Sequence, residues 1–243
     1  MKVFAKTDVG KLRDMNQDCY YISNTTEQLN LYVIADGMGG YTGGEIASNL
    51  AVNSVKNYIQ NNFSSIDHDK EKIKKLIKDS IDYANKIIYK EAKDVQELQE
   101  MGTTLDICLI YNNKVYIGHV GDSRVYRIRK GIIRKLTTDH SYVEKLVTDG
   151  TITKEEAFNH PKKNMLIKAV GCDEEIEADI IVKGFIQNDI ILMCTDGLTN
   201  MLNDDEIYKT LTLDIENATQ NLINNANEKG GYDNITAIII QNN

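Results

Sequence analysis

Residues 31–44 read Leu-Tyr-Val-Ile-Ala-Asp-Gly-Met-Gly-Gly-Tyr-Thr-Gly-Gly, and this stretch decides the fold. Its apolar run is short and stops at Asp36, which is typical of a buried strand. Five glycines follow within eight residues, and glycine lets other groups come close to the backbone. A carboxylate beside bare backbone offers the oxygen ligands that hard metal ions prefer. The stretch therefore predicts a metal site at a strand end.

Two other structures are compatible with parts of this stretch. A tight hairpin turn is the commoner use of Asp-Gly, but it needs a second strand directly afterwards. The residues after Gly44 instead repeat with helical spacing. A dinucleotide-binding loop would need glycine at position 42, which is Thr42, and an acidic residue after a strand-helix-strand unit. Both alternatives fit less well than a metal site.

Composition limits the class of protein. The chain has 243 residues, is 42% hydrophobic and carries a formal net charge of −8, which argues against nucleic acid and anionic membranes as partners. Because it shows neither a signal peptide nor a run long enough for membrane insertion, we expect a cytoplasmic protein. The cysteines form no Cys-x-x-Cys pair, so we expect reduced core residues. They are Cys19, Cys108, Cys172 and Cys194.

The pattern of apolar residues and turns predicts many short strands and four longer helices. Strands are expected at 3–8, 19–23, 31–35, 103–111, 114–120, 123–129, 132–136, 176–182, 189–194 and 235–240, with a turn at 24–30. Helices are expected at 45–63, 70–98, 204–211 and 215–229, with a charged helical segment at 141–158.

These elements predict one domain, residues 1–243, in which two antiparallel sheets pack face to face with helices outside. The four strands between 103 and 136 are joined by turn residues and are expected to form an antiparallel meander. Residues 139–169 are interpreted as an insertion that is less tied to the core. The helix at 70–98 has one long apolar stripe, so a coiled-coil interaction protein is an alternative.

Five aspartates share one local pattern, because each lies at the end of a strand. Asp36, Asp122 and Asp196 follow apolar runs, whereas Asp18 and Asp233 open strands. Strand ends of a sandwich lie at its two edges, so the five can converge on one rim. Crowded carboxylates resist ionising unless a cation lies between them. Oxygen ligands without a Cys or His cluster favour Mg²⁺ or Mn²⁺.

Basic side chains near these aspartates suggest binding of an anion. Arg13 lies five residues before Asp18, and a guanidinium group can hold a phosphate through two hydrogen bonds. Arg124 is interpreted as a structural partner of neighbouring carboxylates, and His119 as a core residue. His140 and His160 flank the insertion, where they could reach a substrate.

Eight motifs in a fixed order run nearly from end to end of the chain. They are Arg13-x-x-Asn16-Gln17-Asp18, Asp36-Gly37-Met38-Gly39-Gly40, Gly43-Gly44-Glu45, Gly102-Thr103-Thr104, Gly118-His119-Val120-Gly121-Asp122-Ser123-Arg124, Thr138-Asp139-His140-Ser141, Thr195-Asp196-Gly197-Leu198 and Asp233-Asn234-Ile235-Thr236. In these motifs the chain resembles the PPM (protein phosphatase 2C-like) family of metal-dependent serine/threonine phosphatases, in its compact bacterial form.

The resemblance implies an α+β fold, a four-layer α-β-β-α sandwich with two central antiparallel sheets, and a mobile flap at about 139–169. It implies that a metal-bridged hydroxide attacks phosphorus directly in phosphoserine and phosphothreonine. The expected substrates are proteins phosphorylated by a bacterial Ser/Thr kinase, including the kinase itself, and the expected state is a monomer. The alternative is a catalytically silent relative that binds phosphoproteins.

The resemblance also implies a role for each site residue. Two catalytic ions, Mn²⁺ or Mg²⁺, are expected at Asp36, the Gly37 carbonyl, Asp196 and Asp233. Asp18 is expected to act through metal-bound water, Asp122 with Asp196 to hold a third ion, and Arg13 to bind the substrate phosphate. Animal members have His where this chain has Met38, and that His is thought to protonate the leaving group. A metal-bound water or a flap histidine is expected to replace it.

Overall fold

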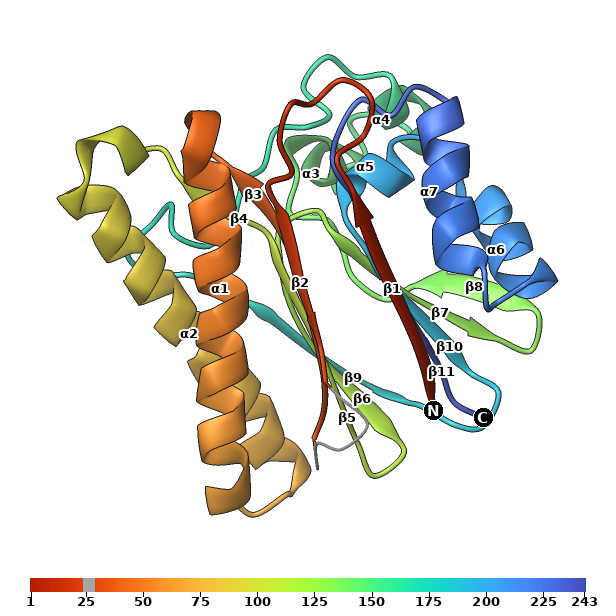
Figure 1. Cartoon of the computed structure of the whole chain (residues 1–243), viewed down its shortest axis with the longest axis horizontal. Helices are drawn as coiled ribbons and strands as arrows, with labels where there is room; N and C mark the ends of the chain where they lie inside the picture. The colour runs from red at the N-terminus through yellow and green to blue at the C-terminus, as the bar shows by residue number, and fades with distance from the viewer. Residues whose placement is uncertain (24–28) are drawn as a thin grey trace.

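A computed structural model describes residues 1–23 and 29–243, so most of the turn expected at 24–30 lies outside the described residues. Two antiparallel sheets lie face to face between two layers of helices (Figure 1). The first sheet has the order β1 (Lys2–Asp8), β11 (Ile235–Gln241), β10 (Ile190–Cys194), β7 (Arg124–Arg129) and β8 (Ile132–Lys135). The second has the order β2 (Asp18–Ile22), β3 (Asn30–Met38), β5 (Leu105–Tyr111), β6 (Lys114–Val120) and β9 (Asp179–Gly184), with β4 (Gly102–Thr103) paired to β3.

Helices cover the outer face of each sheet and complete the predicted four layers. The helices α1 (Gly40–Asn62) and α2 (Lys70–Asp94) pack on the second sheet, and α6 (Asp204–Leu213) and α7 (Ala218–Glu228) on the first. Shorter helices lie in the connections between these elements: η1 (Phe63–Ser65), η2 (Gln96–Leu98), α3 (Tyr142–Thr148), α4 (Lys154–Phe158) and α5 (Asp196–Thr199). No helix of the described residues is long and apolar enough to cross a bilayer.

The strand β3 is buried on both faces, which explains its continuous apolar sequence. Leu31, Val33 and Ala35 point into the core beneath α1 and α2. Tyr32 and Ile34 point into the core between the sheets. Successive side chains of a strand face opposite sides of the sheet, so a strand that lies between two cores has apolar side chains on both faces.

The glycine-rich stretch forms the start of a helix, where the sequence predicted a connecting segment. β3 continues past Asp36 because Gly37 pairs with Thr103, and α1 begins at Gly40. Gly39 has φ +116° and approaches so closely that a Cβ there would lie 2.5 Å from the Glu100 carbonyl oxygen. The glycines therefore bring the helix N-terminus against the strand end.

The helix α2 ends four residues earlier than predicted, at Asp94. The side chain of Asp69 caps its N-terminus by accepting a hydrogen bond from the Lys72 N–H. Its apolar stripe, from Ile73 to Ala92, is buried within the chain's own core. A stripe that is already covered cannot serve as a coiled-coil seam, so the coiled-coil alternative is wrong.

The predicted four-stranded meander is also wrong. β5 and β6 pair in one sheet, whereas β7 and β8 pair in the other. The hairpin turns at Asn112-Asn113 and Lys130-Gly131 form as predicted, with positive φ at all four residues. Between them the chain crosses from sheet to sheet at 121–123, where Gly121 has φ +110°. The crossing places Asp122 at the rim of the sandwich.

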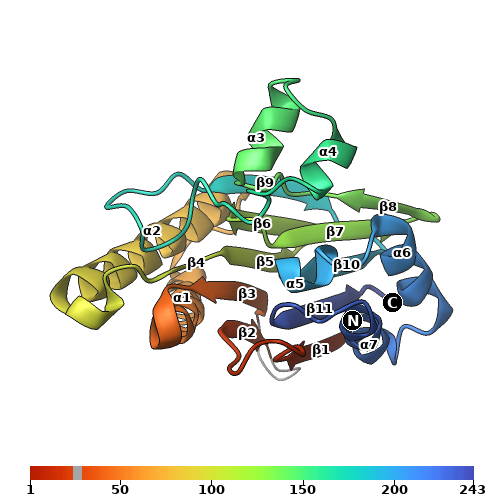
Figure 2. The same cartoon turned by 90° about the horizontal axis from the view of Figure 1, so that it is seen from above.

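Residues 139–169 contain α3 and α4, which project above the sheets in Figure 2. An isolated bridge between Ser141 and Leu166 closes the base of this segment, and a second bridge joins Val170 to Thr103. Ser141 also caps α3 by accepting from the Glu144 N–H at 3.2 Å. We call residues 139–169 the flap.

Candidate metal centre

Aspartates from both sheets meet at one rim of the sandwich. Asp18 lies directly opposite Asp36 in the β2–β3 register, Asp196 opens α5 after β10, and Asp233 precedes β11. With Asp122 from the crossing, all five predicted aspartates are close enough to repel one another. A cavity of about 290 Å³ lies among them. It is lined by Asp36, Gly37, Asp122, Asp196, Asp233 and Arg13, among others.

Asp18 lies behind this cavity rather than on its wall. Its Oδ2 atom accepts hydrogen bonds from the hydroxyls of Thr195 at 2.9 Å and Thr236 at 2.6 Å. Its Oδ1 atom is buried and has no hydrogen-bond partner in the described part of the chain. Burial, with repulsion from Asp196 and Asp233, raises the pKa of Asp18 to about 7.

The neighbouring carboxyls are perturbed in the same direction. Burial raises the pKa of Asp36 well above its ordinary value, and the charges of Asp18 and Asp196 raise it further. Burial and the charge of Asp196 raise the pKa of Asp122 as well. The Oδ1 atom of Asp196 is buried without a partner, although its Oδ2 atom accepts from Asn200 at 2.9 Å. Crowded carboxyls with unpartnered oxygens fit a site for cations.

Among residues 1–23 and 29–243, no three Asp, Glu, His or Cys side chains form a ready group that could hold one ion. The predicted metal ligands do not require three such side chains around one ion. Asp36, Asp196 and Asp233 are expected to be shared between two ions, and the Gly37 carbonyl is a further ligand. Gly37 has no room for a side chain, since a Cβ there would lie 2.0 Å from the Gly44 carbonyl oxygen. The donor set, all carboxylate and backbone oxygen, suits Mg²⁺ or Mn²⁺.

Arg13 lies at the mouth of this cavity, as its proposed contact with phosphate requires. Its Nη2 atom donates to Asp233 Oδ2 at 2.8 Å, and its Nε atom to the Tyr232 carbonyl at 3.4 Å. The side chain is 49% exposed. A guanidinium group that is partly exposed beside the carboxylates can still reach an incoming anion.

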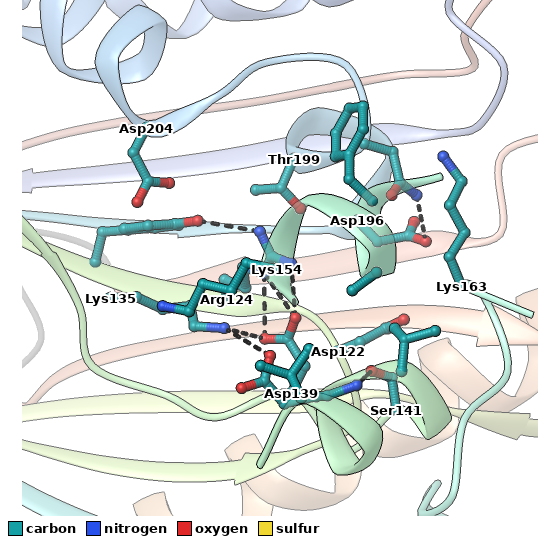
Figure 3. A pocket seen from close by; sticks show the side chains of 17 residues that line it. Asp122, Arg124, Lys135, Asp139, Ser141, Lys154, Lys163, Asp196, Thr199 and Asp204 are labelled. Atoms are coloured by element: carbon teal, nitrogen blue, oxygen red, sulfur yellow. Dashed lines mark hydrogen bonds and ion pairs between the residues drawn. The ribbon is translucent and has the colours of Figure 1, made fainter. Parts of the chain in front are cut away.

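Arg124 has the structural role that the sequence predicted. Its Nε and Nη2 atoms donate to Asp139 Oδ2 at 2.9 and 2.6 Å, and Lys135 donates to Oδ1 of the same carboxylate at 3.1 Å (Figure 3). Burial opposes ionisation of Asp139, but Arg124 and Lys135 nevertheless lower its pKa. The paired Asp139 fixes the base of the flap to β7.

A second cavity, of about 300 Å³, lies between the flap and this rim. Figure 3 shows the side chains that line this second cavity, Asp122 and Asp196 among them. Because these two aspartates also line the first cavity, the two cavities adjoin. Lys154 and Lys163 line it from the flap and Asp204 from α6. This cavity is large enough to hold side chains of a bound ligand next to the group that enters the first cavity.

One histidine, His140, is more deeply buried than expected. His119 is a core residue, as predicted, with Nδ1 at 2.6 Å from Asp106 Oδ1 and Nε2 at 2.9 Å from the Thr138 carbonyl. His140 was expected to reach a substrate, but only 8% of it is exposed, and its Nδ1 accepts from the Gly121 N–H at 3.1 Å. Burial lowers the pKa of His140 to about 4. His140 is therefore a neutral structural residue.

The cysteines are unpaired, and Cys108 and Cys194 are buried as expected. Cys172 is exposed, so the prediction of four core cysteines is wrong at this position. Cys172 follows Gly171 in a loop beyond the flap and does not belong to an apolar strand.

Comparison with known proteins decides the family. The family model described as protein phosphatase 2C matches residues 12–238. The chain belongs to the protein phosphatase 2C family. The serine/threonine phosphatase Stp of Listeria innocua is 36% identical over 241 residues, covering 98% of this chain and 94% of the relative. The protein phosphatase PhpP of Streptococcus pneumoniae is 34% identical, covering 100% of this chain and 98% of the relative.

Solved structures of protein phosphatase 2C relatives share the whole fold. The serine/threonine phosphatase of S. agalactiae superposes with a TM-score of 0.90 at 34% identity, covering 100% of this chain and 99% of that chain. The catalytic domain of PstP, solved in complex with two manganese ions, gives a TM-score of 0.84 at 29% identity and covers 98% of this chain and 96% of that chain. The four-layer α-β-β-α fold is thus confirmed.

Sequence reasoning missed the side chains that hold the aspartates of this protein phosphatase 2C domain in place. Thr195 and Thr236 bind Asp18, as described above. The hydroxyl of Thr104 accepts from the Asp36 N–H at 2.9 Å, and Asn234 accepts from the Gln17 N–H at 2.8 Å. Each of these four residues lies within two residues of a predicted aspartate or strand end, and that proximity was the available signal.

Proposed function

We propose that this protein hydrolyses phosphoserine and phosphothreonine in phosphorylated proteins, with Mn²⁺ or Mg²⁺ as cofactor. One observation carries the proposal: five aspartates from both sheets crowd one rim, and two of their buried oxygens lack partners. The names of the Listeria and Streptococcus relatives, and the manganese ions in the PstP complex, support the same activity.

Each of the rim residues has a different role in the proposed reaction. Asp36, the Gly37 carbonyl, Asp196 and Asp233 hold two ions, which when bound supply a hydroxide for in-line attack on phosphorus and neutralise phosphoryl charge. Arg13 binds the substrate phosphate at the cavity mouth. Asp18, fixed by two threonine hydroxyls, would act through a water held by the ions. Asp122 and Asp196 form a third cation site.

The proton for the leaving group comes from a different source than in animal members. Met38 offers no proton, and His140 is buried with its Nδ1 already accepting a hydrogen bond. Of the two histidines expected beside the substrate, only His160 in the flap is left. His160 also accepts a hydrogen bond at Nδ1, from the Lys162 N–H at 3.1 Å, and it is not among the residues that line either cavity, so we infer that water protonates the leaving oxygen. No cysteinyl-phosphate step is needed.

The biological setting follows from the same proposal. The substrates are a bacterial Ser/Thr kinase and the proteins that it phosphorylates, and the phosphatase acts in the cytoplasm as a monomer. Residues 1–243 form one domain, with the flap at about 139–169 as a subdomain that contacts the substrate. The cavity between flap and rim, with Lys154 and Lys163 on its wall, supports this contact.

Hydrolysis of p-nitrophenyl phosphate with and without Mn²⁺ tests the activity, and release of phosphate from a phosphothreonine peptide tests the substrate class. We expect turnover that requires the metal and is lost in Asp36→Asn. A protein that binds the phosphopeptide but releases no phosphate with Mn²⁺ would instead be a silent binding protein. The intact set of aspartates speaks against that alternative.

A further inference from the structure

A cluster of cationic side chains lies at the far end of β7 from the aspartates. A cavity of about 280 Å³ there is lined by Arg127, Arg129, Lys130, Ile132 and Arg134, and we call it the arginine cleft. Arg127 lies five residues beyond Asp122, which corresponds to about 17 Å along an extended strand. The arginine cleft is therefore separate from the catalytic rim.

Two arginines of the cleft face each other across the last pair of strands. Arg127 on β7 lies directly opposite Arg134 on β8, and opposite residues of an antiparallel pair share one face. Val125, two residues before Arg127, points into the core between the sheets, so both arginines lie on that inner face. β8 is the edge strand of its sheet, and the face opens there. Like charges directly opposite each other destabilise a sheet.

Among the residues that the structure describes, only one arginine of the cleft, Arg129, has a counter-ion. Arg129 donates from Nε and Nη2 to the buried Asp189 at 2.7 and 2.5 Å. Within residues 1–23 and 29–243, Arg127 donates only to the Gly184 carbonyl, at 3.2 Å, and its buried Nε atom finds no partner. Burial, and next the charge of Arg129, lower the pKa of Arg127. The side chains of Arg134 and Lys130 form no hydrogen bond or ion pair within the described part of the chain.

The cleft thus holds three cations without an ion-pair partner in a chain whose net charge is −8. Charge on an edge strand also deters pairing with other chains, which accounts for the exposed Arg134 on β8. It does not account for the buried, unpartnered Nε of Arg127, because that atom is not at the open edge. Guanidinium groups that converge on a small cavity match a phosphoryl group, which accepts several charge-assisted hydrogen bonds.

We propose that the arginine cleft binds a phosphorylated segment of the protein substrate, at a second site that performs no chemistry. This proposal rests on the proposed function, because it takes phosphoproteins as the substrates. Ile132, which is 53% exposed, gives the residue beside the phosphate an apolar contact. A nucleic acid or an anionic bilayer is disfavoured, because the cleft is small and the rest of the chain is acidic.

The test measures binding of a fluorescent phosphothreonine peptide to the full chain by anisotropy, with a chelator present. Without ions the catalytic rim presents its aspartates beside a single arginine, Arg13, which is already paired with Asp233, so the rim repels phosphate and the signal reports the cleft. The variants are Arg127→Gln/Arg134→Gln together and Arg134→Gln alone, the latter at an exposed position. The control is Lys86→Gln/Lys90→Gln on α2, which changes the net charge equally on another surface.

We expect the double arginine variant to bind about tenfold more weakly, the single variant to be intermediate and the lysine control to match the wild type. Turnover of p-nitrophenyl phosphate with Mn²⁺ should be unchanged in all variants, which shows that they fold. Equal peptide affinity of the wild type and the double arginine variant would overturn the second site. So would a loss of affinity in the lysine control as large as in the double arginine variant, or no peptide binding by the wild type. Absence of turnover in the wild type would overturn the proposed function instead.

Discussion

Replacing Asp18 with Asn should stabilise the metal-free protein, and increasingly so as the pH rises. The Asp18 carboxylate is buried beside other acidic groups, and its Oδ1 atom has no partner. An amide at this position is never charged, and its oxygen can still accept the hydroxyls of Thr195 and Thr236. Asn should therefore keep the hydrogen bonds and remove the penalty of a buried charge.

The magnitude follows from the pKa of Asp18, which is about 7 in the fold and 3.8 in its absence. Between these values the folded chain keeps a proton that the unfolded chain has lost, so the free energy of unfolding falls as the pH rises. A difference of about 3 pKa units corresponds to about 4 kcal/mol. Relaxation and water near the carboxylates reduce this, and we expect about 2–4 kcal/mol between pH 4 and pH 8.

The assay is urea unfolding of wild type and Asp18→Asn, with a chelator, at several values between pH 4 and pH 8. The stability of the variant relative to the wild type should increase across this range and level off above pH 7. Asp149→Asn, in an exposed turn, serves as the control and should show no such trend. A difference between Asp18→Asn and wild type that does not change with pH would refute the reasoning.

Three further changes address other parts of the rim. Asp36→Asn or Asp233→Asn should reduce Mn²⁺-dependent turnover of p-nitrophenyl phosphate at least about 100-fold, and near-normal turnover would remove the ligand assignment. Arg13→Ala should raise KM about tenfold with a smaller change in kcat, whereas a loss confined to kcat would argue against phosphate binding. Gly37→Ala should lower the unfolding free energy by about 2 kcal/mol or more, because its Cβ would meet the Gly44 carbonyl at 2.0 Å; an unchanged Tm would contradict this.

The strands that carry the aspartates were predictable because each has a plain physical signature. β3, β10 and β11 are buried on both faces, so they appear as apolar runs that turn or polar residues interrupt. An aspartate at the end of such a run lies at the edge of the sandwich. The sequence therefore predicted the aspartates that the structure brings together, including Asp18 and Asp36 in direct register.

The assignment of strands to sheets was not predictable from the same signals. The segment 121–123 contains Gly and Ser, as hairpin turns do, yet it carries the chain from one sheet to the other. The pairing of β7 with β10 determines that the chain changes sheets at 121–123 instead of forming a hairpin there. That pairing joins residues far apart in sequence, so local signals do not reveal it. The hydroxyls of Thr195 and Thr236 also escaped prediction, because isolated threonines in strands are common.

The most direct test of the two-ion account is a crystal structure of the protein soaked in Mn²⁺, with anomalous differences measured at the manganese absorption edge. We expect two strong peaks in the cavity beside Asp36 and Gly37, with Asp196 and Asp233 as further ligands and Arg13 at its mouth. Soaked crystals without a peak among these aspartates, or with manganese only at other surfaces, would contradict it.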